Sequence, residues 1–349
     1  MSAGDSFGKW ILDCCAKNTR FDILLVMEEA IKAFTKQFSF RPEVNNAPKL
    51  KAKSKYIIIG MGGSHLAAGL LKSSYPILNI SVYSDYGLPM LPEHDLRESL
   101  IILCSYSGDT EEVLFAAKEA KLRELDVAVI SSGGALTEFA KEHYMPHVVI
   151  PETGIEPRMA VGFMMLALSR LMQNEMVEED VRKFGSILDV DASVAEADIL
   201  AQSVFGKIPV VYASNKNLAL AYNWKIKFNE TGKTPCFYNV FPELNHNEIS
   251  SYDVGGFKNG SENIFVILLS DEDDNDRIKV RFSITKDFLK EKNILFYEIK
   301  LKGESQISKI LNSIVMAEWV ALKVASKLNM PDAKTPLISE FKKRLSGSN

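Results

Sequence analysis

The run Tyr56-Ile57-Ile58-Ile59-Gly60-Met61-Gly62-Gly63-Ser64 joins a short apolar segment directly to a glycine-rich turn. A second run of this form, LIILCSYSGDT, covers residues 100–110. An apolar run that ends in such a turn is typical of a buried parallel strand leading into a helix. Because the carboxyl ends of parallel strands meet at one edge of a sheet, we expect the two loops to lie side by side.

The composition of both loops suits an anion. Glycines let the backbone approach a ligand, and helix N-termini offer unpaired N–H groups and a favourable dipole. Hydroxyl groups add hydrogen-bond donors without adding charge. The sequence therefore predicts a site for the phosphate of a small molecule, made by these residues: Gly62, Gly63, Ser64, Ser105, Ser107 and Thr110.

Other interpretations of the loops remain open at this point. The first loop could be a strand–helix turn without a ligand, and Ser107 or Asp109 could simply cap the following helix. A dinucleotide fingerprint would need glycine where His65 stands, so a dinucleotide-dependent enzyme is disfavoured. A P-loop is excluded because Gly-Lys-Ser/Thr does not follow.

Length and composition limit the class of protein. A chain of 349 residues is expected to form two domains, and 46% hydrophobic with 25% charged residues is ordinary for a globular protein. The net charge of −4 argues against a nucleic-acid partner. Because no signal peptide or membrane-length apolar stretch is present, we expect a cytoplasmic protein without membrane contact. The absence of a CxxC pair argues against a zinc site, and a cytoplasmic location predicts reduced thiols at Cys14, Cys15, Cys104 and Cys236.

Strand and helix patterns alternate twice along the chain. This alternation predicts an α/β fold with two tandem, doubly wound parallel-sheet domains at 1–190 and 191–349. The acidic run 271–274 is expected to be a solvated helix start rather than a calcium site. Predicted strands cover 56–60, 80–84, 100–104, 126–131, 147–150, 209–214, 236–240, 264–269 and 294–299. The main predicted helices cover 21–38, 157–175, 178–204, 274–290, 305–327 and 337–345.

Three charged or titratable residues are candidates for chemistry. Glu230 lies near the end of a mostly apolar helix, where partial desolvation would suit a carboxylate to proton abstraction, although a surface pair with Lys227 is the favoured alternative. His246 suits proton transfer near neutral pH, or is a histidine hydrogen-bonded within its loop. Arg158 opposes the dipole at the start of an apolar helix, so it either faces an anion or is exposed.

Several motifs together resemble the bifunctional phosphoglucose/phosphomannose isomerase family, whose members carry two flavodoxin-like sugar isomerase (SIS) domains. The matching segments span residues 60 to 342, nearly the whole chain. The pair WKxxxNE and PELNHNEI is more specific to this family than the two loop motifs, which mark SIS domains generally. The full set is GMGGS, CSYSGDTEE, Pro157-Arg158, WKxxxNE, FPELNHNEI and Thr335-Pro336.

The resemblance implies a role for each matching residue. The two loops would hold a sugar phosphate, and Glu230 would move a proton between C2 and C1 through a cis-enediol. Arg158 would stabilise the enediolate, and His246 and Lys342 would assist ring opening. Thr335 matches a threonine associated with accepting both C2 epimers. The resemblance also implies no metal or other cofactor, and a homodimer in which His246 reaches the site of the neighbouring subunit.

The chain departs from the family pattern at three positions. Asn223 stands where arginine is common, Lys227 where glutamine is usual, and Asp109 where asparagine is frequent. A cation beside Glu230 would weaken it as a base. These departures keep two alternatives open: a SIS protein that binds a phosphosugar without turnover, and an isomerase of another sugar phosphate.

Overall fold

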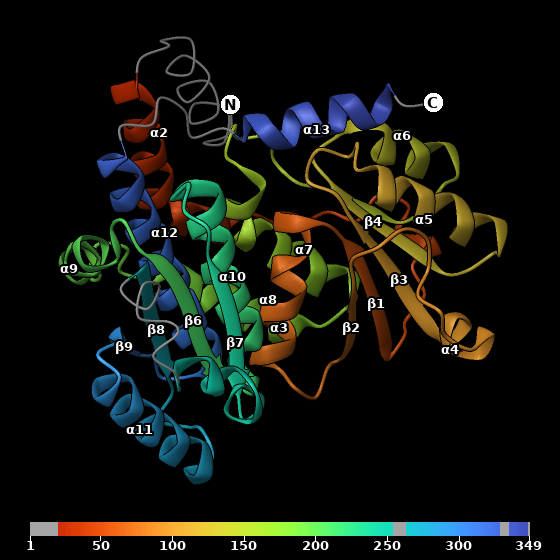
Figure 1. Ribbon diagram of the computed structural model, residues 1–349. Coiled ribbons are helices and arrows are strands. Elements are labelled where there is room, and N and C mark those ends of the chain that lie inside the picture. Colours follow the sequence, from red (N-terminus) through yellow and green to blue (C-terminus); the bar gives the residue numbers. More distant parts are fainter. Residues whose placement is uncertain (1–19, 254–262, 329–334, 348–349) are drawn as a thin grey trace.

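Two parallel β-sheets organise the computed structural model, which describes residues 20–253, 263–328 and 335–347 (Figure 1). The first sheet has the strand order β2-β1-β3-β4-β5 and the second has β7-β6-β8-β9. Both follow the flavodoxin-like order, which places a topological switch point between β1 and β3 and another between β6 and β8. The strands are β1 (Lys55–Gly60), β2 (Asn79–Tyr83), β3 (Ser99–Cys104), β4 (Val127–Ser131), β5 (His147–Val149), β6 (Ile208–Ser214), β7 (Phe237–Phe241), β8 (Ile264–Ser270) and β9 (Leu295–Lys300).

Helices cover both faces of each sheet. The α-helices are α2 (Arg20–Lys32), α3 (Leu66–Ser74), α4 (Glu93–Glu98), α5 (Glu111–Leu122), α6 (Gly134–Glu142), α7 (Val161–Leu171), α8 (Glu175–Ser186), α9 (Val194–Val204), α10 (Leu218–Ile226), α11 (Asp276–Glu291), α12 (Gln306–Lys327) and α13 (Pro336–Ser346). The short turns used below are η1 (Phe34–Ser39), η3 (Gly62–His65), η4 (Pro157–Met159), the π-helical turn η6 (Lys227–Thr231), η7 (Glu243–His246) and η8 (Glu248–Tyr252).

One hydrophobic core joins the two sheets. Successive residues of a strand face opposite sides, so Ile58 points into the shared core while Ile57 and Ile59 point to the outer face under α5 and α6. In the second sheet, Val211 enters the shared core and Tyr212 packs on the α11 side. Helix α12 lies within the shared core and packs against α2, α3, α8, α9 and α10. The two sheets are therefore held together by common apolar burial.

The nine predicted strands are confirmed, with bounds that differ by at most one residue. Three helix predictions are wrong in detail. The helix expected over 157–175 is limited to α7 and is preceded by the 3-10 turn η4. The helix expected over 178–204 is divided into α8 and α9, because the Asp189 carboxylate accepts a hydrogen bond from Asp191 N and turns the chain. The helix expected over 21–38 ends at Lys32 and is followed by the 3-10 turn η1.

The interpretation of 271–274 as a solvated helix start is wrong for its first and last residues. Asp271 and Asp274 are buried, and α11 begins only at Asp276. The Asp271 carboxylate lies 2.6 Å from Lys309 Nζ and 2.7 Å from Lys216 Nζ. Burial raises the pKa of Asp271, but the hydrogen bonds from Lys216 and Lys309 outweigh it and bring the pKa to about 2.

Two further expectations concern membrane contact and the state of the cysteines. None of the helices within the described ranges combines the length and apolarity needed to cross a membrane. Cys104 and Cys236 are free thiols in the interior, and burial raises the pKa of each. Cys14 and Cys15 lie outside the described residues.

We predict that Asp271→Asn lowers the free energy of unfolding at pH 7 by about 2 kcal/mol, because the carboxylate gains that much from its depressed pKa. The folded pKa lies below the ordinary value of 3.8, so this stability is present above that value and is lost as the pH falls toward about 2. The difference between wild type and variant should therefore shrink between about pH 5 and 2.

Urea unfolding across that pH range measures the effect. Asp287→Asn is the control, since its ion pair with Lys290 is exposed on the surface of α11. A pH-independent difference for Asp271→Asn would contradict the assignment.

Candidate active site

The two predicted anion-binding loops meet at the switch point of the first sheet. Tyr106 N donates to Ser64 Oγ at 3.0 Å, which joins the loop after β3 to the loop after β1. Within the second loop, Ser105 Oγ lies 2.7 Å from Thr110 Oγ1, and Gly108 N donates to Ser105 Oγ at 3.0 Å. The structure thus brings the hydroxyl groups of both loops to one edge of the sheet.

Neither proposed cap of the following helix is formed. Helix α5 begins at Glu111, and its N-cap residue Thr110 makes no side-chain capping hydrogen bond. Ser107 Oγ accepts from Asp109 N at 3.3 Å within the loop. Asp109 Oδ1 instead accepts from Ala135 N, 2.9 Å away, in the first turn of α6, where the helix dipole favours a carboxylate. The interpretation of Ser107 or Asp109 as the cap of the following helix is therefore wrong.

Glycine is needed at two positions of the first loop, for a different structural reason at each. Gly62 has a φ of 52°, a left-handed conformation that favours glycine. Gly63 packs on the main chain of η4, where an added Cβ would lie 2.6 Å from Arg158 N. This close approach places Arg158 directly beside the loop.

Arg158 is fully buried, so its interpretation as an exposed arginine is wrong. Its Nε donates to Thr231 Oγ1 at 2.8 Å. Its Nη1 lies 3.2 Å from Glu230 Oε2 and 3.3 Å from Glu156 Oε2. The guanidinium from the first half of the chain therefore contacts two residues of the second half.

Glu230 and Thr231 belong to the π-helical turn that ends α10. Lys227, Glu230 and Thr231 are spaced i, i+3 and i+4, which directs their side chains to one side of a helix. All three contact Arg158, since Lys227 Nζ donates to the Arg158 main-chain oxygen. π-helical turns of this kind are frequent at functional sites.

The favoured interpretation of Lys227, a surface pair with Glu230, is wrong. Lys227 is fully buried, and its ammonium forms an ion pair with Glu318 of α12. In contrast, the Glu230 side chain is 23% exposed to solvent, and its carboxylate contacts Arg158. A partly exposed carboxylate beside a guanidinium can accept a proton from a bound substrate while the cation stabilises the anion that forms.

His246 lies at the other end of the second sheet. Cys236 N donates to Asn229 Oδ1 at 2.8 Å, which fixes the start of β7 next to the Glu230 turn. His246 follows the end of β7, and the two ends of this strand are about 13 Å apart at the usual rise per residue. The structure therefore does not bring His246 and Glu230 of one chain together.

The exposed His246 stands on a well-anchored loop. Glu248 Oε1 accepts from Tyr212 OH at 2.6 Å, and Glu248 Oε2 accepts from Asn239 Nδ2 at 2.5 Å. Tyr212 OH also lies 2.7 Å from Tyr252 OH. These bonds tie η8 to the second sheet and hold the neighbouring turn that carries His246 at the surface.

Thr335 and Lys342 lie on the terminal segment. Thr335 precedes α13, and Lys342 is exposed on that helix, which runs along the top of the view in Figure 1. Within residues 20–253, 263–328 and 335–347, neither residue forms a hydrogen bond or ion pair with Arg158, Glu230 or the two loops. Within the described residues, no hydrogen bond or ion pair therefore connects Thr335 or Lys342 to the first-sheet switch point.

The switch point of the second sheet is filled by protein groups. Asp271 directly follows β8, as Ser105 follows β3, and its carboxylate is neutralised by Lys216 and Lys309. Asn217 Nδ2 also donates to Asp271 Oδ2 at 3.2 Å. A side-chain carboxylate thus occupies the position equivalent to the predicted anion-binding loops of the first sheet.

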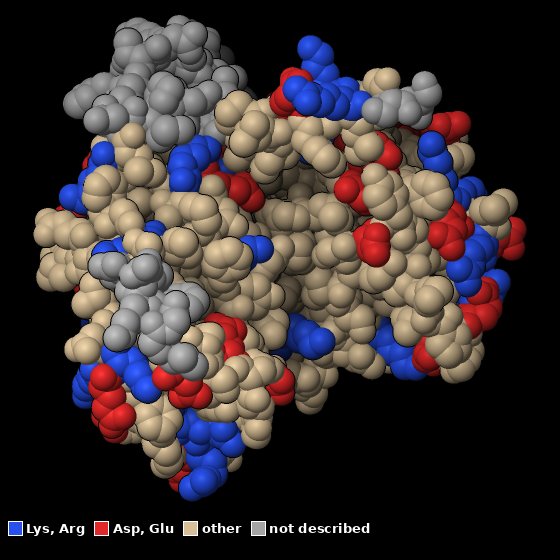
Figure 2. All heavy atoms as spheres, viewed as in Figure 1, with Lys and Arg blue, Asp and Glu red and all other residues tan. Residues whose placement is uncertain are grey.

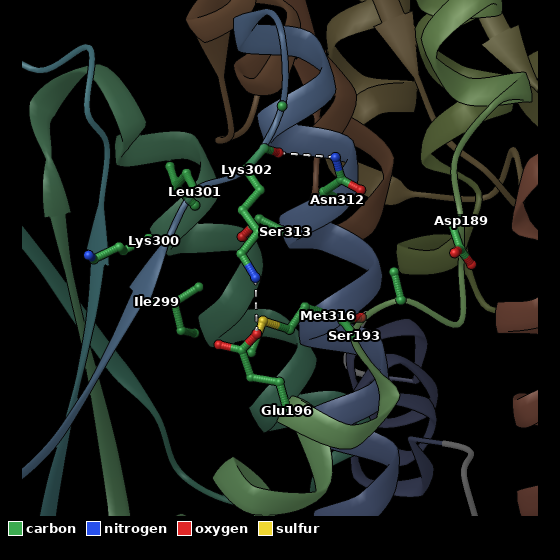
Figure 3. A pocket seen from close by; sticks show the side chains of 12 residues that line it. Asp189, Ser193, Glu196, Ile299, Lys300, Leu301, Lys302, Asn312, Ser313 and Met316 are labelled. Atoms are coloured by element: carbon green, nitrogen blue, oxygen red, sulfur yellow. Dashed lines mark hydrogen bonds and ion pairs between the residues drawn. The ribbon is translucent and has the colours of Figure 1, made fainter.

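Other hollows lie beside these elements. A groove of about 770 Å³ runs along the packed helices α3 and α10 and is lined by residues that include His65, Lys72 and Tyr222, and Figure 2 shows this face hollowed between the two halves. Burial lowers the pKa of His65, whose ring lies 5.8 Å from that of Tyr222. A smaller pocket between α9, β9 and α12 is crossed by the pair Lys302–Glu196, 3.6 Å apart (Figure 3). Among the described residues, no group of three or more His, Cys, Asp or Glu side chains is placed to hold a metal ion.

Sequence reasoning missed Thr231, Glu156 and Glu318. Thr231 adjoins Glu230, and helical spacing could have placed it on the same side of the turn. Glu156 lies two residues before Arg158, but nothing in the sequence shows that its carboxylate turns toward that guanidinium. Glu318 is 91 residues from Lys227 in sequence, so only the tertiary packing of α12 identifies it.

Comparison with known proteins places this arrangement in a class. Residues 193–345 match the family model "Bacterial phospho-glucose isomerase C-terminal SIS domain". The C-terminal domain of glucosamine-fructose-6-phosphate aminotransferase from Francisella tularensis superposes with a TM-score of 0.66 at 13% identity, covering 89% of this chain and 98% of that one. The fold and the loops define a tandem SIS-domain protein.

Two curated proteins named bifunctional phosphoglucose/phosphomannose isomerase are each 30% identical to this chain. The one from Caldicellulosiruptor bescii aligns over 78% of this chain and 84% of its own length. The one from Thermoplasma acidophilum aligns over 84% of this chain and 90% of its own length. The chain belongs to the bifunctional phosphoglucose/phosphomannose isomerase family.

We predict that Gly63→Ala destabilises the protein by about 1–3 kcal/mol, because the new methyl group would overpack the Arg158 main chain. The free energy of unfolding in urea measures this effect. Gly133→Ala is the control, since its added Cβ would meet nothing within 4 Å and its backbone is extended. Equal stability of the two variants would contradict the close packing of η3 on η4.

Proposed function

We propose that this protein interconverts glucose 6-phosphate and mannose 6-phosphate with fructose 6-phosphate. The single observation that carries the proposal is the contact between Arg158 Nη1 and Glu230 Oε2, 3.2 Å apart, beside hydroxyl-lined loops suited to a phosphate. The names of the family members support the same substrates. We also propose that the chain divides into two domains at 1–190 and 191–349. The protein would act on hexose phosphates in the cytoplasm.

The proposed reaction needs one base and one cation. In the open-chain aldose, Glu230 removes the proton from C2, and the electron pair forms the C1–C2 double bond of a cis-enediol. The hydroxyl proton on O2 passes to O1, the C2–O2 bond becomes the carbonyl, and the same carboxyl group returns the first proton to C1, which yields the ketose with no net gain or loss of protons. Arg158 stabilises the negative charge on the enediolate oxygen. No step in this sequence uses a metal or redox cofactor.

The remaining candidates act on binding and ring opening. Gly62, Gly63, Ser64, Ser105, Ser107 and Thr110 hold the phosphate, which fixes the sugar far from its reacting carbons. His246 and Lys342 move the proton of the ring oxygen, and Thr335 lets both C2 epimers bind. These roles follow the family resemblance.

We also propose a homodimer with shared sites. His246 is exposed on an anchored loop about one strand length from Glu230, so it is suited to serve the site of a second copy. A two-fold dimer would then contain two sites, each with Glu230 from one chain and His246 from the other.

The first test is a coupled assay of fructose 6-phosphate conversion to each aldose phosphate, with EDTA present. We expect turnover of both, and we expect Glu230→Gln to lower kcat by about 10²–10⁴-fold, the usual contribution of a general base. Calorimetry should show that the variant still binds fructose 6-phosphate, because the phosphate loops are unchanged.

Glu196→Gln is the control, because it makes the same chemical change in the separate pocket of Figure 3. An undiminished rate for Glu230→Gln would refute its role as base. Binding of fructose 6-phosphate by the wild type without any turnover would favour a phosphosugar sensor.

The shared-site proposal predicts complementation between two impaired variants. Glu230→Gln and His246→Ala chains, denatured together and refolded, should recover about a quarter of wild-type activity, since half of the dimers would be mixed and each would hold one intact site. A mixture of Glu230→Gln with Arg158→Ala should stay inactive, because both residues come from the same chain of a site. Failure of the first mixture to recover would exclude sharing.

A further inference from the structure

Lys227 and Glu318 form a buried ion pair directly beneath the Arg158–Glu230 contact. The Lys227 side chain has no exposed area, and the Glu318 side chain has 6%. Neither is assigned a part in the proton transfers above. We propose that Lys227 and Glu318 are a positioning pair: Lys227 fixes the Arg158 main chain, and Glu318 balances the charge of Lys227. This inference rests on the proposed isomerase function.

The hydrogen bonds of Lys227 explain how it would position Arg158. Its ammonium donates both to the Arg158 main-chain oxygen and to the Glu318 carboxylate. The other side of the same main chain rests on Gly63 of the phosphate loop. A shift of Arg158 would therefore change its distance to Glu230 and its fit to the loop together.

Helix α12 supplies a rigid support for this arrangement. Ser313 Oγ accepts from Trp224 Nε1 at 2.9 Å, five residues before Glu318 binds Lys227. Helix α10, which carries Trp224, and helix α12 both contribute to the core shared by the two sheets. The π-helical turn and the end of α10 are thus attached to α12 at two points.

Charge balance explains why a carboxylate faces this lysine. The charged groups around Lys227 are Arg158 from η4, Glu230 from its own turn and Glu318 from α12. Burial lowers the pKa of Lys227, and the Glu318 carboxylate opposes that change. With both ionised, the pair is neutral as a unit, so Glu230 faces Arg158 without a second uncompensated cation.

A buried ion pair has a recognisable mutational pattern. Removing one partner leaves a buried group unpaired and is costly, whereas replacing both by neutral groups is far better tolerated. A pair that merely contributed two independent contacts would instead give effects that multiply.

The experiment is a double-mutant cycle of Lys227→Gln, Glu318→Gln and the double variant, assayed with fructose 6-phosphate. We expect each single variant to lower kcat at least tenfold while KM changes less than about threefold, because the phosphate loops are intact. The double variant should recover to within about threefold of wild-type kcat. Glu318→Asp, which keeps the charge but shortens the side chain, should lower kcat even if a neutral single variant does not fold.

Asp198→Asn is the matched control, because it breaks a more exposed pair with Lys323 on the same helix α12. It should leave kcat and KM unchanged. Multiplicative losses in the double variant, a rise in KM in place of a fall in kcat, or wild-type kcat in both Glu318 variants would overturn the positioning role. Absence of turnover by the wild type would instead refute the proposed function, so the two failures are distinguishable.

Discussion

The burial of one guanidinium, that of Arg158, couples the two halves of this molecule. A buried cation is costly unless it is paired and hydrogen-bonded. Its partners Glu230 and Thr231 come from the second half of the chain, while its main chain rests against Gly63 of the first. The relative position of the two halves therefore determines whether the Arg158 guanidinium has its ion-pair and hydrogen-bond partners. The shared core around α12 fixes that position.

The two sheets use the same topology for opposite purposes. At the first switch point, the two loops consist of small and hydroxyl-bearing residues, and the nearby carboxylate of Asp109 is directed to the N-terminus of α6. At the second, the Asp271 carboxylate itself binds Lys216 and Lys309. The same kind of loop position thus carries the predicted phosphate site in one half and a structural ion pair in the other.

The sequence predicted what depends on local patterns. Continuous apolar runs such as 100–104 gave the strands, since a strand buried on both faces leaves no other pattern. The two loops and Glu230 could be predicted as site candidates because their motifs are contiguous. The burial of Lys227 and of Asp271 was not predicted, because their partners Glu318 and Lys309 come from a helix distant in sequence. The roles of Thr335 and Lys342 remain predictions from resemblance, because no contact of theirs in the described residues bears on them.

Two of the three departures from the family pattern, Asn223 and Lys227, lie close together in the fold. Asn223 and Lys227 are four residues apart and both fully buried, so they lie one turn apart on the same side of α10 and its π-helical extension. The cation that the resemblance places at 223 is thus found one turn later, with a carboxylate to balance it. Because the Glu318 carboxylate pairs with Lys227, the pair adds no net charge beside Glu230 when both groups are ionised. The Lys227–Glu318 pair therefore removes the objection that a lysine at 227 would weaken Glu230 as a base, and this supports our proposal of turnover over binding alone.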